Sequence, residues 1–177
     1  SGHVSPTTAA HVLEDLDGKI DLIVDAGPAS VGVESTIVAC LDTPALLRPG
    51  GLSRQKIESV LGRALPQAPD TAAETPLAPG MLESHYAPRT TLRLNASRVR
   101  PGEALLAFGT PIPGAGVMLN LSEQGDVEEA AANLFGHLRR LDAMAAPCIA
   151  VMRIPSAGLG EAINDRLRRA AAPKRLP

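Results

Sequence analysis

The sequence predicts an α/β protein built from two units. Short apolar runs of strand length alternate with longer segments in which apolar residues recur at helical spacing. Hydrophobic residues make up 45% of the 177 positions and aromatic ones only 2%, so the core must consist mainly of aliphatic side chains. Residues 1–90 contain 6 Lys or Arg and 11 Asp or Glu, a net charge of −5, whereas residues 91–177 contain 11 and 8, a net charge of +3. This change in composition indicates two units.

In the first unit, serine residues mark the predicted helix starts. Ser5 can cap a first turn and Pro6 suits the first helical position, so we expect a helix over residues 6–17. Ser53 predicts the start of a second helix, which Gly62 ends. Between the two helices, apolar runs predict short strands over residues 22–24, 35–41 and 45–47.

A linker is predicted between the units. The segment from Arg63 to Gly80 contains four prolines and shows neither helical nor strand periodicity, which is typical of an extended connection. We therefore expect domains over residues 1–62 and 90–177, a linker over residues 63–89, and no packed core shared by the two domains.

The second unit is predicted to be a small three-layer α/β sheet, because strands and helices alternate along it. Strands are expected over residues 90–94, 104–108, 117–121 and 148–154, and helices over 127–144 and 159–171. The apolar stripe of the first helix consists of Val127, Ala130, Ala131, Leu134, Leu138 and Leu141, and the inward side of the second of Ile163, Leu167 and Ala170. We expect Arg166, Arg168 and Arg169 to form a solvated helix end that complements the helix dipole, with RNA contact as the alternative.

Several classes of protein and site are excluded. The sequence has no apolar run long enough to span a membrane, and its first residues are unlike a signal peptide, so a cytoplasmic protein is expected. The overall charge of −2 gives no strong attraction to nucleic acid or membranes. Cys40 and Cys148 are far apart and outside any CxxC pair, which favours reduced, buried thiols over a disulfide or a zinc site. Standard phosphate-loop, dinucleotide, zinc-protease and nucleophile-elbow motifs do not occur.

Small polar residues and glycines gather in four segments of the first 90 residues. These segments are SGHVSPTTA, DAGPASVGVESTIV, LLRPGG and HYAP. Each places backbone amides and hydroxyls where they can face an anion or a nucleotide. Structural interpretations remain open for each segment taken singly, because Ser5 can be a cap, Ser35 and Thr36 strand residues, and residues 49–51 a turn.

In their order along the chain, these segments resemble the two-domain threonylcarbamoyl-AMP synthases. The resemblance extends from SGHVSPTTAAHVLEDLDGKIDLIVDAGPASVGVESTIV through LLRPGGLS and APGMLESHYAP to GLGEAINDRLRRAA, which is nearly the whole chain. It implies that residues 1–62 are the C-terminal half of a YrdC-like α/β domain and that residues 90–177 form a small Rossmann-like three-layer α/β domain. A chain that begins without Met, inside such a motif, is expected to be a fragment.

The resemblance also implies an enzymatic activity. A nucleotidyltransferase of this family combines ATP, L-threonine and bicarbonate into threonylcarbamoyl-AMP and pyrophosphate for the threonylcarbamoyladenosine modification of tRNA, with Mg2+ accompanying ATP. The implied partners are the proteins that transfer the threonylcarbamoyl group to tRNA, with double-stranded RNA or tRNA as a weak ligand. The basic residues that the family uses for ATP lie upstream of Ser1, so the fragment alone is expected to be inactive. A nucleotide- or RNA-binding module without catalysis is the alternative, against which the acidic first half argues.

Site residues follow from the matched motifs. No catalytic nucleophile and no metal ligand is implied. The arginine of LRPG suits phosphate oxygens because its guanidinium donates in a fork, and a serine hydroxyl suits a carboxylate. The resemblance assigns threonine binding to Ser35 and ATP binding to Ser1, Ser5, Arg48, His85 and Tyr86.

Overall fold

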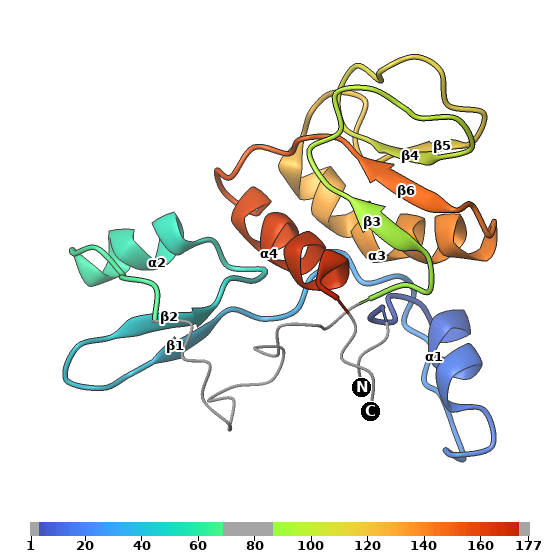
Figure 1. The fold of residues 1–177 in the computed structure, drawn as a ribbon. Helices are drawn as coiled ribbons and strands as arrows, with labels where there is room; N and C mark the ends of the chain where they lie inside the picture. Colours follow the sequence, from blue (N-terminus) through green and yellow to red (C-terminus); the bar gives the residue numbers. More distant parts are fainter. Residues whose placement is uncertain (1–3, 69–86, 174–177) are drawn as a thin grey trace.

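The computed structural model describes residues 4–68 and 87–173, which form a mixed α/β structure with a two-stranded antiparallel and a four-stranded parallel sheet (Figure 1). The α/β class predicted from the sequence is confirmed. The domain limits and the linker stay predictions, because residues 69–86 lie outside the described part. In chain order the elements are α1 (Ala9–Leu16), β1 (Ile37–Ala39), β2 (Ala45–Arg48), α2 (Arg54–Leu61), β3 (Thr91–Arg93), β4 (Ala104–Ala107), β5 (Met118–Asn120), α3 (Val127–Ala143), β6 (Cys148–Val151) and α4 (Gly160–Ala171).

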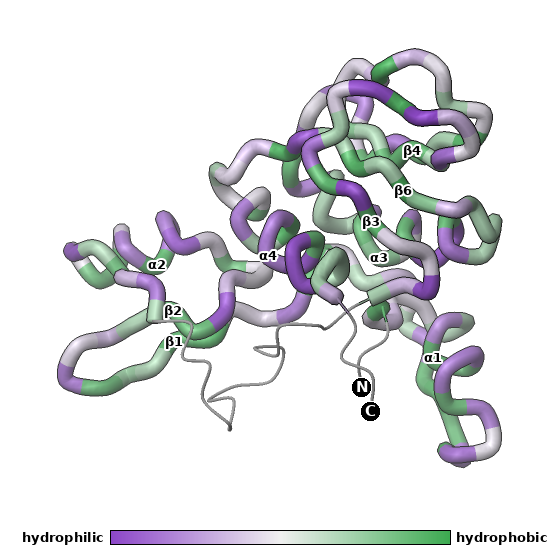
Figure 2. Tube along the Cα trace, viewed as in Figure 1, coloured by the Kyte–Doolittle hydropathy of each residue, from purple (hydrophilic) through white to green (hydrophobic). Residues whose placement is uncertain are grey.

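The parallel sheet forms the centre of the second unit. Its strand order is β3-β6-β4-β5, and each predicted strand of this unit is present. Ile149 and Val151 of β6 face the main core, to which α3 and α4 contribute, whereas Ala150 between them faces a smaller cluster. Loops carrying Val99 and Ile112 pack against that smaller cluster, so the layer opposite the helices consists of loops. Figure 2 shows the apolar residues concentrated along β4 and β6, between these two layers.

Helical spacing predicted α3 correctly. Asp126 caps it by accepting from the backbone N–H groups of Glu128 and Glu129. Five of the six residues of the predicted stripe are buried, together with Phe135, which the stripe did not include. The buried side chains of α3 are Ala130, Ala131, Leu134, Phe135, Leu138 and Leu141.

In the first unit, two predictions of local structure are wrong. Ser5 does not cap α1, because Thr8 accepts from the backbone N–H of His11 and the helix begins at Ala9. No strand forms over residues 22–24, where Leu22 and Val24 are 78% and 85% exposed. An apolar run forms a strand only where a neighbouring strand supplies hydrogen bonds, and no described strand pairs with this run.

The prediction for α2 is confirmed, and the two strands of the hairpin form close to their predicted places. Ser53 accepts from the backbone N–H of Lys56 at the start of α2, and Gly62 ends the helix in the left-handed conformation with a φ of 66°. The thiols are free, as expected, but the expectation that they are buried is wrong, since Cys40 is exposed and Cys148 is half-buried. None of the helices in the described ranges is long and apolar enough to cross a membrane.

The two units share a packed core, so the expectation that no core would join them is wrong. Val4 is buried in the same cluster as Leu138 of α3, and Val33 packs against that cluster. Gly32 lies directly against α3, where a Cβ atom would come within 2.2 Å of the carbonyl oxygen of Ala131. The first unit is therefore packed against the second through apolar contact, not only connected to it by the chain.

Three arginines add ion pairs across the same boundary. Each one donates hydrogen bonds to a carboxylate of the other unit, and each also donates to a backbone carbonyl. The side chains of these arginines are between 0% and 19% exposed, so the pairs are better shielded from solvent than most surface ion pairs. The pairs are Arg54 with Glu161, Arg139 with Asp15 and Glu14, and Arg166 with Glu34.

The packing of Gly32 can be tested against a matched glycine. Gly32 and Gly18 both have a left-handed φ, 73° and 70°, but a Cβ atom at Gly18 would meet nothing within 4 Å. We expect Gly18→Ala to lower the free energy of unfolding by about 1 to 2 kcal/mol through backbone strain alone. Gly32→Ala should lower it by about 1 to 3 kcal/mol more, because the new methyl group overlaps α3. Urea denaturation of both variants measures the difference, and equal losses would contradict the packing of residue 32 against α3.

Candidate functional site

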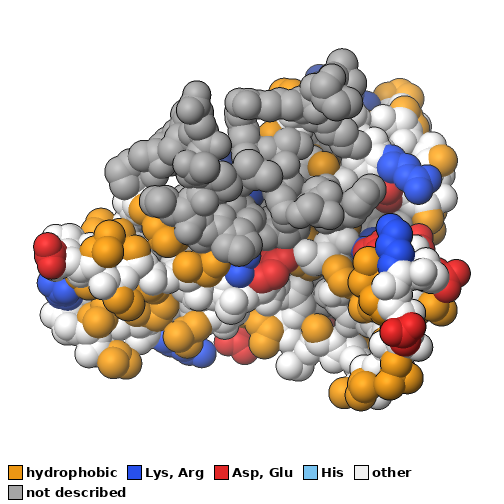
Figure 3. All heavy atoms as spheres, turned by 90° about the horizontal axis from the view of Figure 1, so that it is seen from below, with side chains coloured by type: hydrophobic (Ala, Val, Ile, Leu, Met, Phe, Trp, Pro, Cys, Tyr) orange, Lys and Arg blue, Asp and Glu red, His pale blue; other side chains and the backbone are white. Residues whose placement is uncertain are grey.

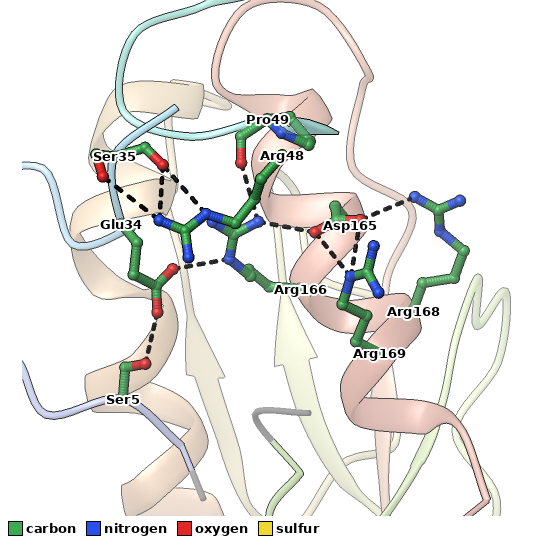
Figure 4. Close-up of polar contacts among 9 residues, drawn as sticks. All are labelled: Ser5, Glu34, Ser35, Arg48, Pro49, Asp165, Arg166, Arg168 and Arg169. Atoms are coloured by element: carbon green, nitrogen blue, oxygen red, sulfur yellow. Dashed lines mark hydrogen bonds and ion pairs between the residues drawn. The ribbon is translucent and has the colours of Figure 1, made fainter. Parts of the chain in front are cut away.

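The structure brings three of the predicted site residues into one network. Ser5, Ser35 and Arg48 lie around Glu34, close to the loop that follows β2 (Figure 4). The other three predicted residues, Ser1, His85 and Tyr86, lie outside the described residues.

Arg48 is positioned by the antiparallel pairing of β1 and β2. Ile37 pairs with Arg48 in this hairpin, so the end of β2 lies beside the start of β1. The Nε and Nη2 atoms of Arg48 donate to the carbonyl oxygen of Ser35 over 3.2 and 2.9 Å, and Nη2 also lies 3.4 Å from the Ser35 hydroxyl. With the residue only 7% exposed, this guanidinium holds the Ser35 backbone in place from within the protein.

The LRPG segment is more than a surface turn, because its glycines make close backbone contacts. A Cβ atom at Gly50 would lie 2.3 Å from the carbonyl oxygen of Glu34 and 2.4 Å from the backbone nitrogen of Thr36. The N–H of Gly51 donates to the same Glu34 carbonyl over 2.9 Å. Only glycine allows the chain to approach this closely, so residues 34–36 and 48–51 form one structural unit.

Glu34 is the centre of the polar network. The Ser5 hydroxyl donates to Oε1 of Glu34 over 2.5 Å, and Nε of Arg166 donates to Oε2 over 2.8 Å. Burial of the carboxyl group favours its neutral form, but the charge of Arg166 and the hydrogen bonds from Ser5 and Arg166 outweigh this effect and lower the pKa of Glu34. Glu34 is therefore a carboxylate at neutral pH, and Ser5 serves as its hydrogen-bond donor.

The expectation that Arg166 belongs to a solvated helix end is wrong. Its side chain is fully buried, and Nη1 donates to the carbonyl oxygen of Pro49 over 3.0 Å and to Asp165 over 2.7 Å. Arg168 is 70% exposed and, like Arg169, pairs with Asp165. Because these three arginines face carboxylates within the chain, the described part of this cluster does not favour RNA binding.

Glu34 and Arg166 are parts of the site that the sequence did not predict. Glu34 lies in the segment DAGPASVGVESTIV, in which the resemblance assigns a role to Ser35 alone. The position of Arg166 in the sequence could have indicated its burial. It lies three residues after Ile163 and four before Ala170, on the side of α4 that the apolar residues occupy. A charged residue on the inward side of a helix indicates a buried ion pair.

A hollow of about 710 Å³ opens beside Ser35. Its lining is largely apolar, and Figure 3 shows hydrophobic side chains gathered over the part of the molecule that contains β1, β2 and α2. The hollow is lined by Val31, Val33, Ser35, Thr36, Val38, Cys40, Pro44, Gly51, Leu52, Ile57 and Leu61.

This arrangement suits binding more than covalent chemistry. The Ser35 hydroxyl lies where a polar network meets an apolar hollow, which fits a small ligand with a polar head and an aliphatic part. The Ser5 hydroxyl donates to a carboxylate and does not face a general base such as histidine. Among residues 4–68 and 87–173, no three His, Cys, Asp or Glu side chains cluster as metal ligands would.

Two family models match the chain. Residues 52–172 match the C-terminal domain of threonylcarbamoyl-AMP synthase, and residues 1–50 match a family described as telomere recombination. The chain is 37% identical over 188 residues to the threonylcarbamoyl-AMP synthase of Bacillus subtilis, a match that covers 97% of this chain and 54% of that protein. It is also 37% identical over 187 residues to the Pyrococcus abyssi enzyme of the same name, with 97% and 55% covered.

Solved structures agree with these sequence matches. The crystal structure of Sua5 from Pyrococcus abyssi in complex with L-threonine resembles this chain with a TM-score of 0.84 at 34% identity, over 97% of this chain and 55% of that one. A variant of the same protein has a TM-score of 0.81 at 31% identity. The chain spans about half the length of the curated relatives it matches. With a family model over residues 52–172 and this structural similarity over 97% of its length, the chain belongs to the threonylcarbamoyl-AMP synthase family.

Proposed function

We propose that this chain takes part in L-threonylcarbamoyladenylate synthesis, in which ATP, L-threonine and bicarbonate give threonylcarbamoyl-AMP and pyrophosphate. The observation that carries the proposal is the position of Ser35, which Arg48 holds at the border of the apolar hollow. Family membership and the L-threonine complex of the Pyrococcus abyssi protein support it. The product would then serve the modification of tRNA, through proteins that transfer the threonylcarbamoyl group, and we place the chain with these substrates in the cytoplasm.

Ser35 is the proposed contact for L-threonine. Its hydroxyl is a short donor for the carboxylate of the amino acid, and the neighbouring Arg48 guanidinium makes the local potential favourable for an anion. The aliphatic lining of the hollow, which includes Val33 and Val38, suits the methyl group of threonine. Binding of a small, polar amino acid is consistent with this combination of charge and apolar surface.

ATP binding is proposed for the polar segments around Ser35. Arg48 supplies positive charge, Ser5 belongs to the same network, and Ser1, His85 and Tyr86 are assigned through their motifs. The similar Pyrococcus abyssi variant has an adjacent histidine and tyrosine both replaced by alanine, and His85–Tyr86 is the one such pair in this sequence. That likeness supports a role for the pair.

The proposed reaction needs positioning and charge stabilisation. The amine of threonine and bicarbonate give a carbamate and water. A carbamate oxygen then bonds to the α-phosphorus of ATP while the bond between the α-phosphorus and the bridging oxygen breaks, which releases pyrophosphate. No covalent intermediate on the protein is required, so fixed donors such as Ser35 and cations such as Arg48 suffice. Mg2+ is proposed to enter on the phosphates of ATP as part of the substrate, since the described residues form no metal cluster.

Replacing Ser35 tests the proposed threonine contact. In the full-length gene product, pyrophosphate release should require ATP, L-threonine and bicarbonate together. Ser35→Ala should raise the KM for threonine about 10-fold, because a hydrogen bond to a charged ligand contributes about 1.5 kcal/mol. The KM for ATP should change less. Ser53→Ala is the control, because Ser53 caps α2 and should cost only about 1 kcal/mol of stability. An unchanged KM for threonine in Ser35→Ala would refute the assignment.

Arg48→Lys tests whether the guanidinium fork is needed. Lysine keeps the positive charge but cannot donate to the Ser35 carbonyl from two nitrogens, as Arg48 does. We expect the variant to lose about 1 to 3 kcal/mol of unfolding free energy and to bind threonine more weakly. The exposed Arg63 provides the control, and Arg63→Lys should change neither property. If both variants behave like the parent protein, Arg48 does not fix the Ser35 backbone.

A further inference from the structure

Arg166 reaches from the second unit to both polar segments of the candidate site. Its Cα belongs to α4, and its guanidinium lies between Glu34, Pro49 and Asp165 (Figure 4). Nε donates to Oε2 of Glu34 over 2.8 Å, and Nη1 donates to the Pro49 carbonyl over 3.0 Å. A side chain 132 residues from Glu34 and 117 residues from Pro49 in the sequence thus contacts both segments directly.

The two partners of Arg166 in the first unit are immediate neighbours of candidate binding residues. Glu34 precedes Ser35, and Pro49 follows Arg48. Through the other oxygen of its carboxylate, Glu34 also accepts from Ser5. One buried guanidinium is therefore connected to three of the residues assigned to substrate binding, although it lies in a different unit.

The charges around Arg166 indicate a specific role for the ion pair with Glu34. Asp165 is already paired with Arg169 over 3.1 Å and with Arg168 over 3.5 Å, so it does not depend on Arg166 alone. Glu34, in contrast, forms its ion pair with Arg166. A buried pair of this kind contributes little net stability, because desolvation offsets the attraction, but it strongly restricts where its partners can lie.

We propose that Arg166 is a positioning residue, which sets the placement of Ser35 and Arg48 for substrate through its contacts with Glu34 and Pro49. The proposal rests on the proposed function of the Ser35 site. In this arrangement the second unit contributes to substrate affinity without touching substrate. A shift of the site segments by about 1 Å suffices to reduce catalytic efficiency by about 100-fold.

The test compares Arg166→Met with Arg54→Met in the full-length gene product. Both changes remove an arginine that joins the units through a carboxylate, and Arg54 pairs with Glu161 at the start of the same helix, α4. We expect Arg166→Met to raise the KM for threonine by about 10- to 100-fold at equal folded concentration. Arg54→Met should lower thermal stability. It should leave the KM values for threonine and ATP within about 2-fold of the parent, because the effect of removing one contact varies by about that factor between sites.

Two further variants keep the proposal testable if Arg166→Met does not fold. Arg166→Lys retains the charge but loses the two-point contact, and Glu34→Gln retains the shape of its side chain but loses the charge. Both should raise the KM for threonine more than they lower kcat. Normal KM values in any folded variant at position 166, or equal rises in KM for Arg54→Met, would overturn the positioning role. Absence of activity in the parent protein would instead refute the proposed function.

Discussion

The buried charge of Arg166 is the constraint on which the candidate site depends. A guanidinium that is fully removed from water must be matched by acceptors inside the protein, because an unmatched charge there is strongly unfavourable. The acceptors in this structure come from Glu34, Pro49 and Asp165, so satisfying one side chain fixes the relative places of two loops and a helix. The apolar contacts nearby have no comparable directionality, and they hold the units together without setting this geometry.

The boundary between the two units combines both kinds of interaction. Val4 and Gly32 place the first unit against the core side of α3, where the contact is close enough to exclude even a methyl group at residue 32. Ion pairs from Arg54 on α2 to α4, and from Arg139 on α3 to α1, add to this contact. The contact between the two units thus combines apolar packing against α3 with ion pairs, and the polar network around Glu34 is one part of it.

Local sequence patterns were sufficient for much of the fold. The stripe of α3, the cap at Ser53 and the strands of the parallel sheet follow from periodicity and end signals, which depend only on near neighbours. The same reasoning failed at residues 22–24, because strand formation there needed a partner strand that periodicity cannot reveal. The cap predicted at Ser5 is absent for a similar reason, since the Ser5 hydroxyl donates to Glu34, which is distant in the sequence. The motif order indicated Ser35 and Arg48, but not the contact between them or the part played by α4.

The long sequence separation within the Glu34–Arg166 pair has a consequence for biosynthesis. A chain grows from its N-terminus, so Glu34 is made 132 residues before the arginine that neutralises it. At typical rates of translation this interval lasts roughly 7 to 26 seconds. During that time the loops around Ser35 have an acidic group without its counter-charge, and they reach their final arrangement only when α4 docks. The segment that is proposed to meet substrate therefore leaves the ribosome well before the helix that completes it.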